Sequence, residues 1–218
     1  MSPRRTKIAL ATIVAFVAVV AVAIAARGGH DTAAPTAGNG GSSSPASKAD
    51  ASPPAGHADA FAWLHPSAVP AGWTTLQLPD SPAQMPVPPG WKHAHGDPGT
   101  QTAELKNASG EIVGYLNATP RQGTESLADW SDFRVDHNRD EGDRDVKLLA
   151  TVTGFRFPSG TGSCVLDAYR TSSDHHYREL ACIVAGDSAT TVIVAAAPPE
   201  NWAAEAPTLE RAITSFTT

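Results

Sequence analysis

The chain has 218 residues, of which 41% are apolar, 17% charged and 6% aromatic, and it contains 18 Gly and 18 Pro. This length and composition exclude two large domains and fit one globular domain beside a poorly ordered segment. The formal net charge is −6, but residues 1–27 hold four basic side chains and no acid, so the remainder carries −10. Because an acidic body lacks the basic clusters that neutralise phosphate, we expect no nucleic-acid partner and no docking on an anionic bilayer surface.

Residues 8–26 form an apolar stretch without a charge. As a helix it would span roughly 28 Å, which is close to the thickness of the hydrocarbon core. Basic residues precede it and only Arg27 follows it, so the positive-inside rule places the rest of the chain outside the cytoplasm. We therefore expect residues 1–27 to be a signal anchor of a single-pass cell-membrane protein. The alternative is a secretory signal that is cleaved after its small residues, which would give a secreted protein.

The segment that follows has the composition of a tether. Between residues 28 and 60, 26 of 33 residues are Gly, Ala, Ser, Thr or Pro. Such a segment cannot bury enough apolar surface to offset the entropy of ordering it. The sequence thus predicts a disordered linker at 28–65 and one globular domain at 66–218.

The first half of that domain predicts short strands and one helix. Apolar runs at 73–78 and 85–91 are interrupted by prolines, which favours edge strands. Residues 102–106 and 111–117 flank a turn in which Gly110 supplies a positive φ, and they predict a β-hairpin. An amphipathic helix is expected over about 126–140. Its apolar stripe is formed by Leu127, Trp130, Phe133 and His137, its solvent face by Asp129, Asp132 and Asp136, and Ser126 and Asp129 have capping-box spacing.

The second half predicts a meander and a closing helix. Strand-like stretches at 147–157, 163–169, 177–185 and 190–197 are separated by turn residues. Near the end, an apolar face is formed by Trp202, Leu209, Ala212, Ile213 and Phe216, while Pro207 either opens a second helix or kinks a single one. The fold class predicted is α+β, an antiparallel sheet flanked by helices.

Cys164 and Cys182 are the only cysteines. If the two neighbouring strands form a hairpin centred on Ser173, these cysteines lie directly opposite each other, on the same face as Leu166 and Leu180. Opposite Cα atoms in a non-hydrogen-bonded antiparallel pair are about 4.5 Å apart, which suits a disulfide. We expect this bond to form in an exported domain and to contribute about 3 kcal/mol. The alternatives are two buried thiols or, less favoured, metal ligands.

Several of these patterns together resemble a known family. They are Pro88–Trp91, the strand ending at Ala118–Pro120, a helix opening at Glu125–Leu127, the meander, and the path from Pro198 to a helix closing at Phe216. This arrangement resembles the Mog1/PsbP-like fold, especially the exported actinobacterial LpqN-type envelope proteins, over about 69–218. The resemblance implies an α-β-α sandwich and a binding or assembly module, with no shared catalytic residues. The chain differs from the lipoprotein members because it has no Cys near the anchor for lipid attachment.

Candidate chemistry in the sequence is sparse. His93, His95 and Asp97 alternate and could share one strand face, but no fourth metal ligand is positioned, so they predict solvent-exposed polar residues instead of a metal site. The Gly-rich segment at 159–163 leads into a strand, whereas a phosphate cradle needs a helix N-terminus. We therefore expect no catalytic residues, no metal and no cofactor.

Three tryptophans in the proline-rich entry are the candidates for ligand or partner contact: Trp63, Trp73 and Trp91. With the expected anchor, they favour a membrane-anchored extracytoplasmic module that binds an envelope protein or an apolar envelope molecule without catalysis. The alternatives are an exported hydrolase with a site assembled across the fold and a purely structural spacer domain.

Overall fold

A computed structural model describes residues 60–218 of the chain. The expected anchor at 1–27 and nearly all of the expected linker lie outside these residues. Within the described part, no helix is both long enough and apolar enough to cross a membrane.

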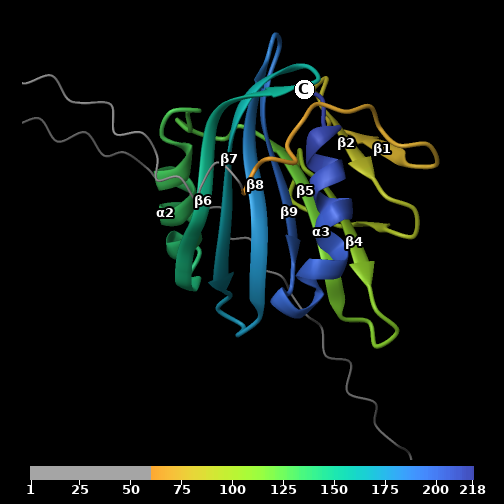
Figure 1. Ribbon diagram of the computed structural model, residues 1–218, viewed down its shortest axis with the longest axis vertical. Helices are drawn as coiled ribbons and strands as arrows, with labels where there is room; N and C mark the ends of the chain where they lie inside the picture. Colours follow the sequence, from red (N-terminus) through yellow and green to blue (C-terminus); the bar gives the residue numbers. More distant parts are fainter. Residues whose placement is uncertain (1–59) are drawn as a thin grey trace, which may run out of the picture. The chain divides into compact units, whose positions relative to one another are not determined.

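The centre of the domain is a seven-stranded antiparallel sheet with the strand order β3-β4-β5-β9-β8-β7-β6 (Figure 1). Its strands are β3 (Lys92–Ala94), β4 (Gln101–Lys106), β5 (Ile112–Pro120), β6 (Arg144–Phe157), β7 (Gly160–Arg170), β8 (His176–Gly186) and β9 (Thr190–Ala197). A separate hairpin is formed by β1 (Thr74–Gln77) and β2 (Gln84–Val87). The predicted hairpin and meander are confirmed. The two are joined into one sheet by the pairing of β5 with β9, which are far apart in the sequence.

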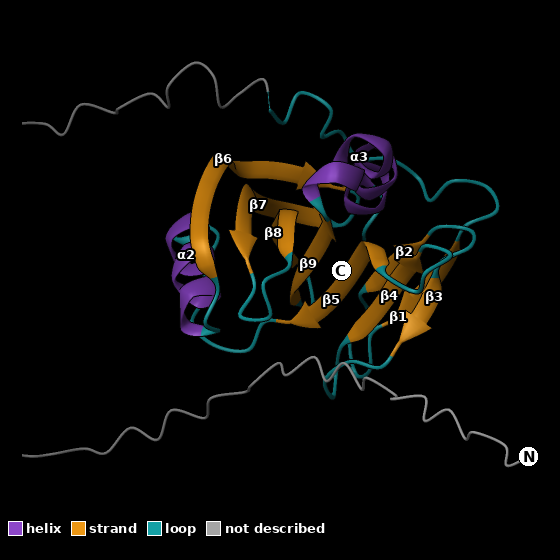
Figure 2. Ribbon diagram, turned by 90° about the horizontal axis from the view of Figure 1, so that it is seen from below, coloured by secondary structure: helices purple, strands orange, loops and turns teal. Residues whose placement is uncertain are grey.

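A helix covers each face of the sheet. The alternation of side chains places Cys164, Leu180 and Ile193 on the face that packs against α3 (Pro199–Thr214). Val165 and Ala181 lie on the opposite face, where they pack against the first residue of α2 (Trp130–Asp140). Figure 2 shows the sheet between the two helices. This is the α-β-α arrangement that the sequence predicts.

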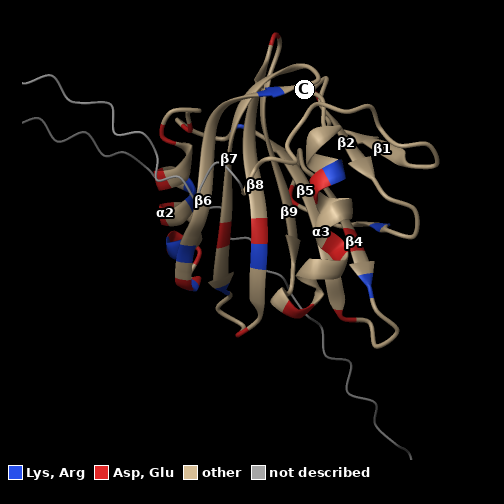
Figure 3. Ribbon diagram, viewed as in Figure 1, with Lys and Arg blue, Asp and Glu red and all other residues tan. Residues whose placement is uncertain are grey.

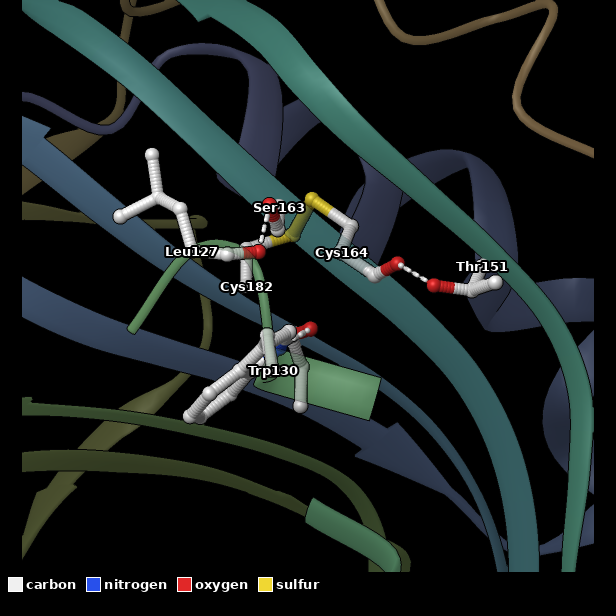
Figure 4. The surroundings of a disulfide bond; sticks show 7 residues. Leu127, Trp130, Thr151, Ser163, Cys164 and Cys182 are labelled. Atoms are coloured by element: carbon white, nitrogen blue, oxygen red, sulfur yellow. Dashed lines mark hydrogen bonds between the residues drawn. A yellow bond between two sulfur atoms is a disulfide. The ribbon is translucent and has the colours of Figure 1, made fainter. Parts of the chain in front are cut away.

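The β7–β8 register agrees with the prediction at every pair. Cys164 is opposite Cys182, and Leu166 is opposite Leu180. The two cysteines are joined by a disulfide with a Cα–Cα distance of 4.1 Å, and both are fully buried. The residues beside the bond hold α2 on the other face of the sheet (Figure 4). The Trp130 indole donates to the Ala181 carbonyl at 2.9 Å, and the Ser163 hydroxyl donates to the Leu127 carbonyl at 2.6 Å.

The helix at 126–140 begins later than its sequence pattern predicts. Residues Ser126 and Asp129 form the expected local hydrogen bonds, but regular helix starts at Trp130. The three aspartates of the predicted solvent face are exposed. His137 was expected to complete the buried stripe, and this is wrong, because its side chain is 40% exposed while Asn138 is buried. In the last turn of the helix the inward-facing residue is therefore Asn138 and not His137, because this part of the helix packs against the buried polar residue Asp167 of the sheet.

The structure also moves the start of the globular domain and decides how many helices close the chain. Phe61 and Leu64, which the sequence places in the linker, are 3% and 1% exposed and belong to the main core. The globular body therefore begins before residue 66, because these two side chains extend the apolar surface under α3. Pro207 lies inside α3, so the closing segment is one helix.

We predict that the disulfide is a major source of stability. The variant Cys164→Ala/Cys182→Ala should lower the unfolding free energy by about 2–4 kcal/mol, because the unfolded chain gains loop entropy and the core loses apolar contact. Urea denaturation measures the change, and the native protein should have an intact mass about 2 Da below that of the all-thiol form. Two free thiols in native exported protein would contradict both the bond and its role.

Candidate functional site

A row of polar side chains crosses the face of the sheet that α2 covers. Asp167 of β7 lies directly opposite Glu179 of β8, in the same hairpin register as the two cysteines. Their odd-numbered positions place them on the face opposite the disulfide. Asp167 is 0% exposed and Glu179 is 1% exposed. Both residues lie inside their strands, and Figure 3 shows acidic positions within β7 and β8.

Helix α2 supplies the groups that meet this row. Residues four apart share a helix face, so Trp130, Arg134 and Asn138 all point at the sheet. The Arg134 guanidinium donates twice to Glu179 Oε1, at 2.8 Å from Nε and 2.6 Å from Nη2. The Tyr169 hydroxyl donates to the other oxygen, Glu179 Oε2, at 2.8 Å. Both oxygens of the Glu179 carboxylate are therefore occupied, and this buried ion pair fixes α2 on β8.

Asp167 is less well satisfied than its neighbour. Its Oδ2 accepts a hydrogen bond of 3.5 Å from the Asn138 amide, and no partner for Oδ1 is present among the described residues. Burial and the nearby Glu179 carboxylate raise the pKa of Asp167 from 3.8 to about 8, although Arg134 opposes the shift. The raised pKa favours the protonated form of Asp167 at neutral pH, which avoids a second buried negative charge beside Glu179.

The surrounding groups respond to the same buried charges. Burial would lower the pKa of Arg134, but the Glu179 carboxylate raises it above its ordinary value. Burial and Glu179 raise the pKa of Tyr169 well above 10. Burial and the carboxylates of Glu141 and Glu179 raise the pKa of Asp143, just beyond the end of α2, to about 6. The cluster therefore holds one cation, Arg134, among several acidic groups.

The geometry suits support of α2 better than chemistry on a substrate. The members of the cluster bond to one another, and the two carboxylates at its centre are closed off from solvent. Two shallow hollows lie on the surface, one beside Arg121 and the β8–β9 turn and one between α2 and β6, and none of these buried groups lines either. The cluster positions the helix, and the outer side of the same helix forms one wall of the second hollow.

The three tryptophans predicted to contact a ligand lie against the core. Trp91 is 8% exposed, and its ring lies over Gly114, where an added Cβ would come within 2.7 Å of a ring carbon. Trp63 and Trp73 are half-buried and pack on the same core, and the Trp63 indole donates to the Ala60 carbonyl at 2.8 Å. They do not form an exposed aromatic cluster. Contact with a ligand stays a prediction for the exposed edges of Trp63 and Trp73.

The histidine pattern yields no metal centre in the part of the chain that the structure describes. Across residues 60–218, no three or more His, Cys, Asp or Glu side chains come together in a way that could hold a metal ion. His93 lies on β3, whereas His95 and Asp97 lie beyond its end. The strand that would align all three on one face is too short.

The hairpin register contains a sequence signal for the buried cluster. Positions 167 and 179 are related by the same register that pairs the cysteines. Two acids opposite each other within strands otherwise rich in buried residues require a cation from elsewhere. Arg134 is that cation, and its place on the helix face aligned with Trp130 was available from the i to i+4 spacing.

Comparison with known proteins finds distant structural similarities. No protein family and no curated protein matches the chain. Similar solved structures include PsbP (CyanoP) from Synechocystis, with 14% identity, a TM-score of 0.46, and coverage of 70% of this chain and 97% of the other. A Pseudomonas aeruginosa protein of unknown function, described as a putative regulator, has 11% identity, a TM-score of 0.46 and coverage of 67% and 96%. LpqN of Mycobacterium tuberculosis, involved in cell envelope biogenesis, has 14% identity, a TM-score of 0.31 and coverage of 69% and 81%.

We predict that removing one partner of the buried ion pair is costly. Glu179→Gln should lower the unfolding free energy by about 2–4 kcal/mol, because it leaves the Arg134 charge buried without its counter-charge. In urea denaturation, Arg134→Met added to Glu179→Gln should recover a large part of the loss. As a control, Asp136→Asn breaks an exposed pair with Arg139 and should change stability by less than about 0.5 kcal/mol. Equal effects of Glu179→Gln and Asp136→Asn would contradict the role given to the buried pair.

A second prediction concerns pH. The pKa of Asp167 is higher in the folded protein than the value of 3.8 that it has when unperturbed. The stability linked to its protonation is therefore fully present below about pH 4 and is lost as the pH rises towards 8. Relative to Asp167→Asn, the wild type should lose roughly 2–4 kcal/mol of unfolding free energy between pH 5 and pH 8. Chemical denaturation across this range measures the difference.

The matched control for this experiment is the exposed Asp187. Asp187→Asn should keep the pH-dependent loss of stability of the wild type, because Asp167 and its partners are intact in this variant. A parallel profile for Asp167→Asn as well would show that Asp167 is ionised throughout the range and that the cluster is not arranged as described.

Proposed function

We propose that this protein is a membrane-anchored, extracytoplasmic module of the cell envelope that acts by binding or assembly and without catalysis. The observation that carries the proposal is the Cys164–Cys182 disulfide, fully buried between two central strands. Structural disulfides of this kind persist in oxidising compartments and are rare in the cytosol. The basic residues before the apolar stretch at 8–26 also support a location of the domain outside the cytoplasm.

The arrangement of the titratable groups supports binding over catalysis. General acid-base chemistry needs a perturbed group within reach of a substrate, usually in a cleft. Asp167 and Glu179 are instead enclosed beneath α2, where their bonds serve the helix. We infer that the buried polar groups shape the domain, and that function lies on its surface.

We predict that the side of the membrane can be read by thiol labelling in intact cells. The native cysteines are joined, so a single introduced Cys reports its own position. Ser43→Cys, in the expected tether, should react with a membrane-impermeant maleimide before lysis. Ser2→Cys, before the apolar stretch, should react only after lysis. Labelling of Ser43→Cys only after lysis would place the domain in the cytoplasm and overturn the proposal.

A native-gel measurement separates a binding module from a spacer. After mild detergent extraction, a binding or assembly module should migrate in a particle larger than the detergent-bound monomer. Migration as the monomer alone would favour the spacer. Turnover of generic chromogenic esters by the purified chain would favour the hydrolase and overturn the absence of catalysis.

A further inference from the structure

The outer side of α2 and the edge strand β6 enclose a surface groove that the buried cluster does not use. This α2–β6 groove is lined by Asp132, Val135, Asp136, Arg139, Val146 and Leu148. Leu148 is 39% exposed and the adjacent Leu149 is 41% exposed. Large apolar side chains exposed to this degree are otherwise represented only by Val69 among residues 60–218. Two neighbouring exposed leucines at a groove lined by both apolar and charged side chains are a feature of interaction surfaces.

The exposure of the leucines follows from the path of β6. Leu148 pairs with Asp167, so its side chain lies on the α2 face and reaches the groove. The next paired residue is Ala150, which leaves Leu149 as the extra residue of a β-bulge. The bulge leaves Leu149 unpaired at the open edge of the sheet, where no neighbouring strand covers it in the described part of the chain.

The same irregularity determines how a partner can bind. The β6 ladder shifts register at three places along the strand, between residues 144 and 147, 148 and 150, and 152 and 155. Repeated bulges of this kind prevent an added strand from forming a continuous ladder. A partner is therefore held through side chains in the groove rather than by extending the sheet.

The charges around the groove indicate the chemistry of that partner. Asp132, Asp136 and Arg139 line it, and Asp136 pairs with Arg139 at 3.2 Å. Asp129 and Asp140 extend the acidic outer surface of α2. Lys147 pairs with Ala168 and so lies on the opposite face of the sheet. The groove thus combines the apolar side chains of Val135, Val146 and Leu148 with Asp132 and the Asp136–Arg139 pair, a net negative lining that favours a ligand with basic groups beside apolar ones.

We propose that the α2–β6 groove docks a segment of a partner protein in which Lys or Arg residues flank apolar side chains. The inference rests on the proposed binding function and gives that function a surface and a partner class. An anionic lipid surface is disfavoured because the groove is acidic. A second copy is disfavoured because residues 60–218 carry 19 acidic and 11 basic side chains, so two such bodies repel each other.

The test is photo-crosslinking of the full chain in intact cells. A benzoylphenylalanine side chain replaces the groove residue Leu148 in one variant and Val69, which is exposed outside the groove, in the matched control. The Leu148 probe should give one discrete protein adduct, and mass spectrometry of the crosslinked peptide should show a segment with Lys or Arg beside apolar residues. Adding Asp132→Lys/Asp136→Lys should lower the adduct yield about tenfold, because the attraction becomes repulsion. Adding Asp187→Lys, elsewhere on the surface, should leave the yield unchanged.

Each other outcome overturns the inference. A crosslink to a lipid, to a second copy of this chain or to an acidic segment would assign the groove to a different occupant. An adduct from the Val69 probe alone would show that the groove is not the binding surface, but it would still agree with the proposed binding function. No adduct from either probe, together with monomeric migration on the native gel, would overturn both. Far-ultraviolet circular dichroism and the intact mass of the disulfide-bonded chain verify that each variant is folded.

Discussion

The pairing of β7 with β8 is the constraint on which the rest of the domain depends. One register places Cys164 opposite Cys182 on the first face of the sheet and Asp167 opposite Glu179 on the second. Because side chains alternate along a strand, a shift of one residue would move the cysteines under α2 and the acids into the apolar core beneath α3. The covalent bond therefore holds the register that allows the acids to meet their partners on the other face.

Helix α2 links the interior of the domain to its surface. Its inner face carries Trp130, Arg134 and Asn138, each hydrogen-bonded to the sheet. Its outer face carries the acids that border β6. A buried ion pair with both carboxylate oxygens occupied is a directional attachment, in contrast to apolar contact, which tolerates sliding. The depth and position of the outer groove are consequently set by bonds formed on the other side of the helix.

The buried acids also show what such an attachment costs. Glu179 is matched by Arg134 and Tyr169, but Asp167 has one weak partner and a pKa raised to about 8 by burial and by Glu179. A neutral Asp167 avoids the strong repulsion that two buried carboxylates would cause. The domain therefore accepts an imperfectly satisfied group at the place where α2 is fixed, which is compatible with a role of that helix in presenting a surface.

The sequence by itself determined the class of fold, the hairpin register and the disulfide. Period-two alternation, turn residues and two cysteines at symmetric positions are local signals, and they do not depend on the rest of the chain. The sequence also indicated α2, because Leu127, Trp130 and Phe133 recur at helical spacing.

The tertiary structure alone decided which side chains meet. Arg134 and Glu179 are 45 residues apart, and their contact exists because β9 pairs with β5 and α2 crosses back over β7 and β8. The same packing buried Trp91 over Gly114, exposed His137 and brought Phe61 into the core. Side-chain pattern determines local structure, but burial is decided by which surfaces the chain topology places in contact, and that information is not local.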